Sequence, residues 1–177
     1  MRFEKLEQNI IDMIKEEQAK LGYRKESIRL YYPLSSLVHL TGADLGEQEM
    51  LDLLSEFGEE TKEHLGGVAV TAKKERFCFL IPEEGVVYVK EHTSPNEFIH
   101  DLVNLVGTHG CTMDEIKALF EKQPWPVTVE PVNNEEFDIL IRFGEGADDP
   151  YYYCFKDEGC HIIYHRFLPE DYADFDF

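Results

Sequence analysis

Hydrophobic residues recur every three or four positions through the first third of the chain, a spacing that predicts helices. The first helix is expected over residues 2–21 and a later one over residues 47–65. Between them, the apolar residues of segment 26–33 fit both a strand and a helical face. Pro33 disfavours helical geometry at the residue before it, so we favour a kinked helix in two pieces, the second opening at Pro33 and ending at Gly42.

The hydrophobic period changes from about 3.6 to about 2 after the two glycines at 66–67, which indicates strands. Short β-branched and aromatic runs occupy residues 68–71, 77–81 and 86–89. Charged or Pro/Gly-containing turns separate them. Strands joined by short turns pair antiparallel, so this pattern predicts a three-stranded meander.

Two helix-capping patterns predict a pair of helices within residues 98–120. Ser94 is followed by a proline and, three residues on, by Glu97, so hydroxyl and carboxylate can satisfy free amide groups at a helix start. Thr112 and Glu115 repeat this capping box. The sequence therefore predicts two short helices joined by a glycine-containing turn.

The last third of the chain again favours strands, with a tight turn at residues 157–159 and an acidic end. The expected strands are 127–129, 137–143, 151–155 and 160–167. Helices grouped between two antiparallel meanders predict an α+β fold rather than a doubly wound parallel sheet. We expect a single domain over residues 1–177, with a helical part at 1–67, a mixed part at 68–167 and an acidic tail at 168–177.

Acidic residues outnumber basic ones by 36 to 17, which gives the 177-residue chain a formal net charge of −19. Proteins that hold nucleic acids or anionic membranes carry excess Lys and Arg, so we expect neither partner. No apolar run approaches the roughly 18 residues that span a bilayer, and the acidic start lacks an export signal. Four scattered cysteines do not make a disulfide framework, so we expect free thiols in the cytoplasm.

The helix pair followed by strands is similar to a helix-turn-helix or winged helix. Charge opposes the DNA-binding interpretation, because the second helix carries Asp114, Glu115 and Glu121 against Lys117 and Lys122. Two core helices joined by a turn are the simpler interpretation. A winged-helix-like regulator that binds a protein instead of DNA is compatible with the acidic second helix.

Candidate catalytic residues are dispersed. Cys111 follows His109 by two residues and precedes a helix start, where the helix dipole lowers thiol pKa values. A partly buried loop thiol without special reactivity is the favoured interpretation of Cys111. His161 and His165 would lie about 13 Å apart on one strand, too far to share a zinc ion, and Cys160 would point away from His161. No metal-binding or nucleophile motif is present, so we expect no cofactor and no metal. A small enzyme or metal-dependent hydrolase using His109, Cys111, His161 and His165 remains the alternative.

Residues 132–177 hold twelve acidic and three basic residues, together with several aromatic ones. Rings that anchor and carboxylates that steer are typical of a surface that receives a basic protein. The candidate partner face consists of Asp148, Asp149, Tyr151, Tyr153, Tyr172 and Phe175. The simpler alternative is a solvated acidic surface that keeps the protein soluble.

The stretch Leu21-Gly22-Tyr23-Arg24-Lys25-Glu26-Ser27-Ile28-Arg29-Leu30-Tyr31-Tyr32-Pro33-Leu34 resembles a family of uncharacterised bacterial proteins known as a domain of unknown function. The resemblance would cover most of the chain, and it implies no activity, ligand or catalytic residue. The sequence as a whole favours a non-enzymatic binding or regulatory protein with an acidic face for a basic partner. An immunity-type role would suit that face.

Overall fold

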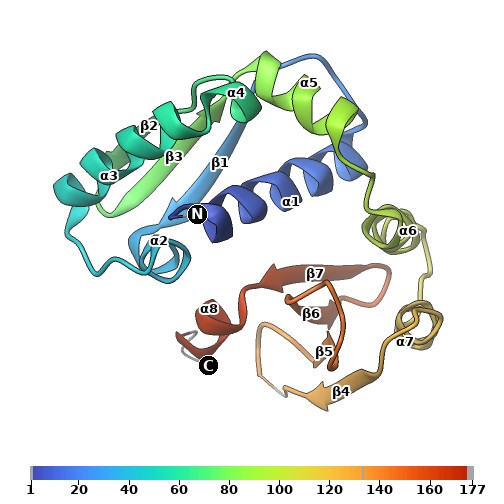
Figure 1. The fold of residues 1–177 in the computed structure, drawn as a ribbon. Coiled ribbons are helices and arrows are strands. Elements are labelled where there is room, and N and C mark those ends of the chain that lie inside the picture. The colour runs from blue at the N-terminus through green and yellow to red at the C-terminus, as the bar shows by residue number, and fades with distance from the viewer. Residues whose placement is uncertain (1, 133, 175–177) are drawn as a thin grey trace. The chain divides into compact units, whose positions relative to one another are not determined.

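The structure is a computed structural model that describes residues 2–132 and 134–174. The described residues form eight helices and two antiparallel sheets of three and four strands, which confirms the α+β class (Figure 1). Contacts divide the chain into two compact units, Met1–Ile99 and His100–Phe177, called here the N-terminal and C-terminal units. The single-domain organisation stays a prediction.

The N-terminal unit combines five helices with the three-stranded sheet, whose strand order is β1-β3-β2. Its elements are α1 (Glu4–Leu21), β1 (Ile28–Pro33), α2 (Leu34–Thr41), α3 (Glu47–Glu60), α4 (Lys62–Leu65), β2 (Ala69–Lys73), β3 (Arg76–Ile81) and α5 (Glu83–His92). The expected helix over residues 47–65 is thus divided at Thr61.

The expectation of a helix at residues 28–33 is wrong, because this segment is strand β1. It pairs antiparallel with β3, from Ile28 opposite Ile81 to Pro33 opposite Arg76. β1 is an edge strand, where a proline at the end costs no ladder hydrogen bond. Pro33 then serves as the N-cap of α2, as the expected second helical piece required.

The expected strand at residues 86–89 is also wrong, because these residues belong to helix α5. Val86 and Val89 are three positions apart and both are buried, which is the spacing of a helix face. The sheet has three strands, as expected. Its third strand is β1, and not residues 86–89.

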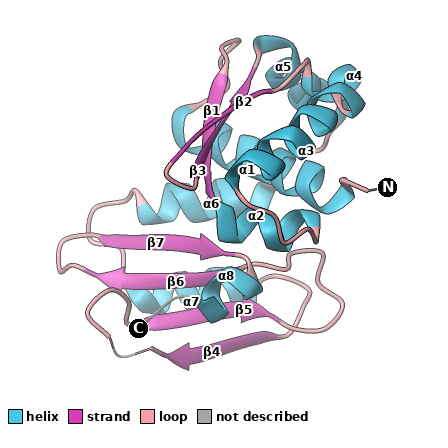
Figure 2. Ribbon diagram, turned by 90° about the vertical axis from the view of Figure 1, so that its left-hand side faces the viewer, coloured by secondary structure: helices cyan, strands magenta, loops and turns pink. Residues whose placement is uncertain are grey.

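Helices cover one face of the N-terminal sheet (Figure 2). The covered face carries Leu30, Tyr32, Phe77, Phe79 and Ile81, all buried. The Phe79 ring makes edge contacts with Tyr32 of β1 at 5.1 Å and with Phe57 of α3 at 6.5 Å. The opposite face carries the alternate residues of each strand.

The C-terminal unit contains the second meander, with strand order β4-β5-β6-β7, as predicted. Its elements are α7 (Met113–Glu121), β4 (Val127–Pro131), β5 (Ile139–Phe143), β6 (Tyr152–Asp157), β7 (Ile162–Phe167) and α8 (Pro169–Asp174), while α6 (Glu97–Val106) spans the boundary between the units. α7 and α8 lie on opposite faces of this sheet (Figure 2). Phe120 of α7 contacts Tyr153 and Phe155, and Tyr172 of α8 contacts Phe167.

The capping box at α7 is present as predicted. The Thr112 amide donates to Glu115 Oε2 at 2.8 Å, and the Glu115 amide donates to Thr112 Oγ1 at 3.3 Å. At α6 the expected cap is displaced from Ser94, because the amide of Ile99 donates to Asn96 Oδ1. Among the described residues, no helix combines the length and apolar character needed to cross a membrane.

Candidate functional site

Two rings of the expected partner face lie inside the C-terminal unit. Tyr153 is 0% exposed and Tyr151 is 5% exposed. The Tyr153 hydroxyl donates to Asp149 Oδ2 at 2.5 Å, and the Tyr151 amide donates to Asp149 Oδ1 at 2.9 Å. Burial raises the pKa of Tyr153 well above its usual value, so its hydroxyl stays protonated. This corrects the expectation of two exposed anchors: Asp149 and these rings order the entry into β6.

The remaining residues of the predicted partner face differ in their exposure. Asp148 is exposed, whereas Tyr172 is half-buried and packs its ring against Tyr152 at 5.4 Å. Burial, followed by the nearby Cys154, Glu130 and Tyr152, raises the pKa of Tyr172. Phe175 lies outside the described residues.

The pKa of Cys111 is raised, which makes its thiol a poor nucleophile. It is buried, and its burial raises the thiol pKa, with the carboxylates of Glu115 and Asp157 adding to the rise. Of the two interpretations of Cys111, the structure agrees with the buried loop thiol and not with a thiol activated by the helix dipole. Desolvation and like charge outweigh the dipole here, so the thiol stays protonated at neutral pH. His109 lies exposed in the loop that precedes it.

Cys160 and His161 form a thiol–imidazole pair. Both precede β7 and are exposed, and Cys160 Sγ lies 3.2 Å from His161 Nδ1. They were expected to point to opposite faces of a strand. Because β7 begins only at Ile162, the alternation of a strand does not apply to them.

His165 lies in β7 opposite the buried Cys154 of β6, and its ring centroid is 4.2 Å from that of Phe167. Burial raises the pKa of Cys154 from 9.0 to about 12. Among the described residues, no group of three or more His, Cys, Asp or Glu is placed to hold a metal ion. The candidate catalytic residues His109, Cys111, His161 and His165 therefore do not form one cluster.

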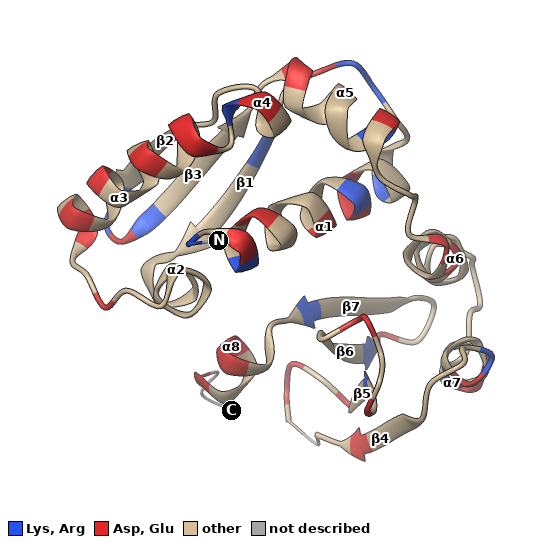
Figure 3. Cartoon of the chain, in the orientation of Figure 1, with Lys and Arg blue, Asp and Glu red and all other residues tan. Residues whose placement is uncertain are grey.

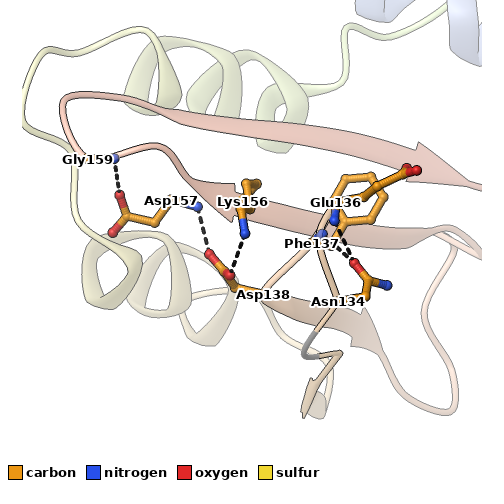
Figure 4. A network of polar contacts seen from close by, with 7 residues as sticks. All are labelled: Asn134, Glu136, Phe137, Asp138, Lys156, Asp157 and Gly159. Carbon is orange, nitrogen blue, oxygen red and sulfur yellow. Dashed lines mark hydrogen bonds and ion pairs between the residues drawn. The ribbon is translucent and has the colours of Figure 1, made fainter. Parts of the chain in front are cut away.

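A polar network joins the β4–β5 connection to the β6–β7 hairpin (Figure 4). Asp138 accepts from the Asp157 amide at 2.8 Å and from Lys156 Nζ at 3.2 Å. The Asp157 amide, more than Lys156, lowers the pKa of Asp138. Asn134 Oδ1 accepts from the amides of Glu136 and Phe137. An ionised carboxylate held by two donors is suited to fixing loops and is a poor proton acceptor.

An acidic row that is not among the predicted site residues follows the solvent side of α3 and continues onto α4. Its members, all exposed, are Glu49, Asp52, Glu56, Glu59, Glu60 and Glu63. In Figure 3 acidic residues recur along α3. Within the row, Arg2 pairs with Glu56 at 2.5 Å and Lys62 with Glu59 at 3.9 Å. The signal was available as acids spaced three and four apart, opposite an apolar stripe.

Comparison with curated proteins found no match, and neither did comparison with solved structures. One family model matches residues 3–175, almost the whole chain. The match confirms the resemblance drawn from the segment Leu21 to Leu34. The chain thus belongs to the family described as "Domain of unknown function, E. rectale Gene description (DUF3877)".

Proposed function

We propose that the protein is a non-catalytic, cytoplasmic binding module that receives a basic segment of a partner protein on the acidic row of α3. The observation that carries the proposal is the row itself, six exposed carboxylates that follow one helical stripe. The proposed partner surface therefore lies on the N-terminal unit, and not on the face that the sequence predicted in the C-terminal quarter of the chain. An immunity-type role, in which an acidic protein neutralises a basic one, suits this chemistry.

The acidic row costs the protein stability. Like charges three or four residues apart on a helix destabilise it by about 0.2–0.5 kcal/mol per pair. Asp52 and Glu56 form one such pair, and Glu56 and Glu60 form another, although the ion pair of Arg2 with Glu56 offsets part of this repulsion. From Glu49 to Glu60 the row extends about 16 Å along α3, at about 1.5 Å per residue. Repulsion between the carboxylates of the row destabilises α3. A partner that neutralises these charges explains their presence better than solubility alone.

The state of the thiols supports a non-catalytic role. Cys111 and Cys154 are buried with raised pKa values, so neither supplies a thiolate at neutral pH. All four cysteines are free, which is in keeping with a reducing cytoplasm.

Titration of a fluorescently labelled lysine-rich peptide, followed by anisotropy, tests the proposal. The double variant Asp52→Lys/Glu60→Lys should weaken binding about tenfold or more, since it places two cations in the row. The matched control Glu135→Lys/Glu136→Lys makes the same change in net charge at two exposed residues of the C-terminal unit, and should weaken binding less than about twofold.

Thermal unfolding supplies a second readout. Asp52→Lys/Glu60→Lys should melt at a higher temperature than the unmodified protein, because it replaces repulsion around Glu56 with attraction. Equal loss of peptide binding in both double variants would overturn the proposal, because binding would then follow net charge alone.

A further inference from the structure

The uncovered face of the N-terminal sheet has a regular layout. Strand pairing places Arg29, Leu80 and Ala69 side by side in one row. Tyr31, Cys78 and Thr71 form the middle row, and Pro33, Arg76 and Lys73 form the third. These nine residues are called here the outer sheet face. Its centre carries the Tyr31 ring beside the smaller side chains of Cys78 and Thr71, and cations lie at both ends.

The charge of the outer sheet face opposes that of the whole protein. The three strands carry Arg29, Lys73 and Arg76 and no carboxylate. The strands with their flanking segments, residues 24–33 and 69–81, hold six cations and two carboxylates. These are Arg24, Lys25, Arg29, Lys73, Lys74 and Arg76, against Glu26 and Glu75. In Figure 3 Lys and Arg appear on β1 and β3, in contrast to the acidic α3.

Tyr31 provides an aromatic anchor in the middle of this face. Its side chain is 56% exposed, although it lies in a strand whose neighbouring residues Leu30 and Tyr32 are buried. The Arg76 guanidinium lies 5.7 Å from the centre of the Tyr31 ring, which holds both groups in place. Tyr and Arg are the residue types most enriched among those that dominate binding energy at protein interfaces.

We propose that the outer sheet face binds an extended acidic segment of a partner protein. An apolar side chain of the segment packs over Cys78 and Leu80 beside Tyr31. Its carboxylates meet Arg29 at one end and Arg76 with Lys73 at the other. The two ends are about 13 Å apart, four residues along a strand at about 3.3 Å each. A short peptide spans that distance.

A peptide fits this face better than a nucleic acid. A nucleic-acid strand continues beyond the cations and meets the field of a molecule whose net charge is −19. A short acidic segment senses only charges within about 8–10 Å, the screening length at physiological salt. Within that distance cations outnumber carboxylates, because the strands and their flanking segments hold six cations against Glu26 and Glu75.

This proposal is independent of the one for α3, because the two surfaces have opposite charge and prefer opposite partners. A variant that removes one surface should leave binding at the other unchanged. Failure of either proposal can therefore be told from failure of the other.

The test uses a labelled synthetic peptide with a leucine–phenylalanine centre and glutamates at both ends, titrated with the full chain and followed by anisotropy. Arg29→Glu should weaken binding about tenfold or more, and Arg29→Gln should weaken it less. Tyr31→Ser, which leaves the charge unchanged, should weaken it about tenfold. Lys122→Glu, an equal charge change at an exposed residue of the C-terminal unit, should alter it less than about twofold. Circular dichroism confirms that each variant is folded.

Three results would overturn the proposal. The first is equal weakening by Arg29→Glu and Lys122→Glu, which would reduce the effect to net charge. The second is displacement of the peptide by a single-stranded oligonucleotide at lower concentration than by the unlabelled peptide. The third is a dimer, detected by light scattering, that Arg29→Glu dissociates, because the face would then bind a second copy of the chain.

Discussion

Tyr31 and Tyr32 are neighbours in β1, yet they have opposite environments. Tyr31 is 56% exposed and Tyr32 is 7% exposed, as the alternation of a strand requires. The Tyr32 hydroxyl donates to Asn9 Oδ1 at 2.6 Å and so joins β1 to α1. Asn9 is itself buried within an apolar helix stripe. A polar pair inside the core therefore helps to fix which helix covers this sheet.

Tyr32→Phe removes this bond and keeps the ring. We expect a loss of about 1–2 kcal/mol in the free energy of unfolding, because Asn9 Oδ1 stays buried without that donor. Urea denaturation measures the loss. Tyr31→Phe is the matched control and should change stability by less than about 0.5 kcal/mol. Equal effects of the two variants would contradict a role for the buried hydroxyl.

Cys154 makes stability depend on alkaline pH. Its pKa is about 12 in the folded protein against 9.0 ordinarily, so the folded state retains a proton that the unfolded state releases. The stabilisation is present below pH 9 and is lost as pH rises towards 12, by up to about 1.4 kcal/mol per pH unit. Cys154→Ala should flatten the fall between pH 9 and 12, measured by urea denaturation at each pH. Parallel slopes for both proteins would disprove the assignment.

Close approach between elements decides the geometry around α5. Gly85 lies in the first turn of this helix, directly against the end of α4. A Cβ at Gly85 would lie 2.3 Å from the carbonyl oxygen of Leu65. Backbone atoms cannot yield as a flexible side chain can. The glycine is therefore required by packing, although its φ is not in the left-handed region.

Gly85→Ala should destabilise the protein by about 2 kcal/mol or more, although alanine is ordinarily favoured over glycine in helices by about 1 kcal/mol. Glu84→Ala, at the exposed neighbouring position, should change stability by less than about 0.5 kcal/mol. Thermal and urea unfolding measure both. A stabilising Gly85→Ala would mean that α4 and α5 separate at little cost.

On the scale of the whole molecule, two compact units share one chain and one continuous helix, α6. The only tryptophan, Trp125, lies in the C-terminal unit, where its ring contacts Phe143 at 5.5 Å. Its fluorescence reports that unit alone, whereas far-ultraviolet circular dichroism reports helices throughout the chain.

A single domain, as we propose, should unfold in one transition in urea, with the same midpoint by Trp125 fluorescence and by circular dichroism at 222 nm. The midpoints coincide if the units unfold together, because each then loses structure when the other does. Two separated midpoints would instead establish two independent domains.

Four features could be predicted from the amino-acid sequence: the α+β class, the second meander, the Thr112–Glu115 cap and the family resemblance. These features depend on residues that are close in the chain, such as a turn between two strands or a hydroxyl three residues from a carboxylate. The strand at residues 28–33 and the helix at residues 86–89 could not be predicted, because they depend on contacts with distant parts of the chain. Both segments have spacings that suit either state, and only pairing with β3 and burial against other elements selects one. The outer sheet face likewise depends on folding, because it combines residues 28–33 with residues 69–81. The acidic row differs, since it lies within residues 49–63 and its spacing can be read from the sequence.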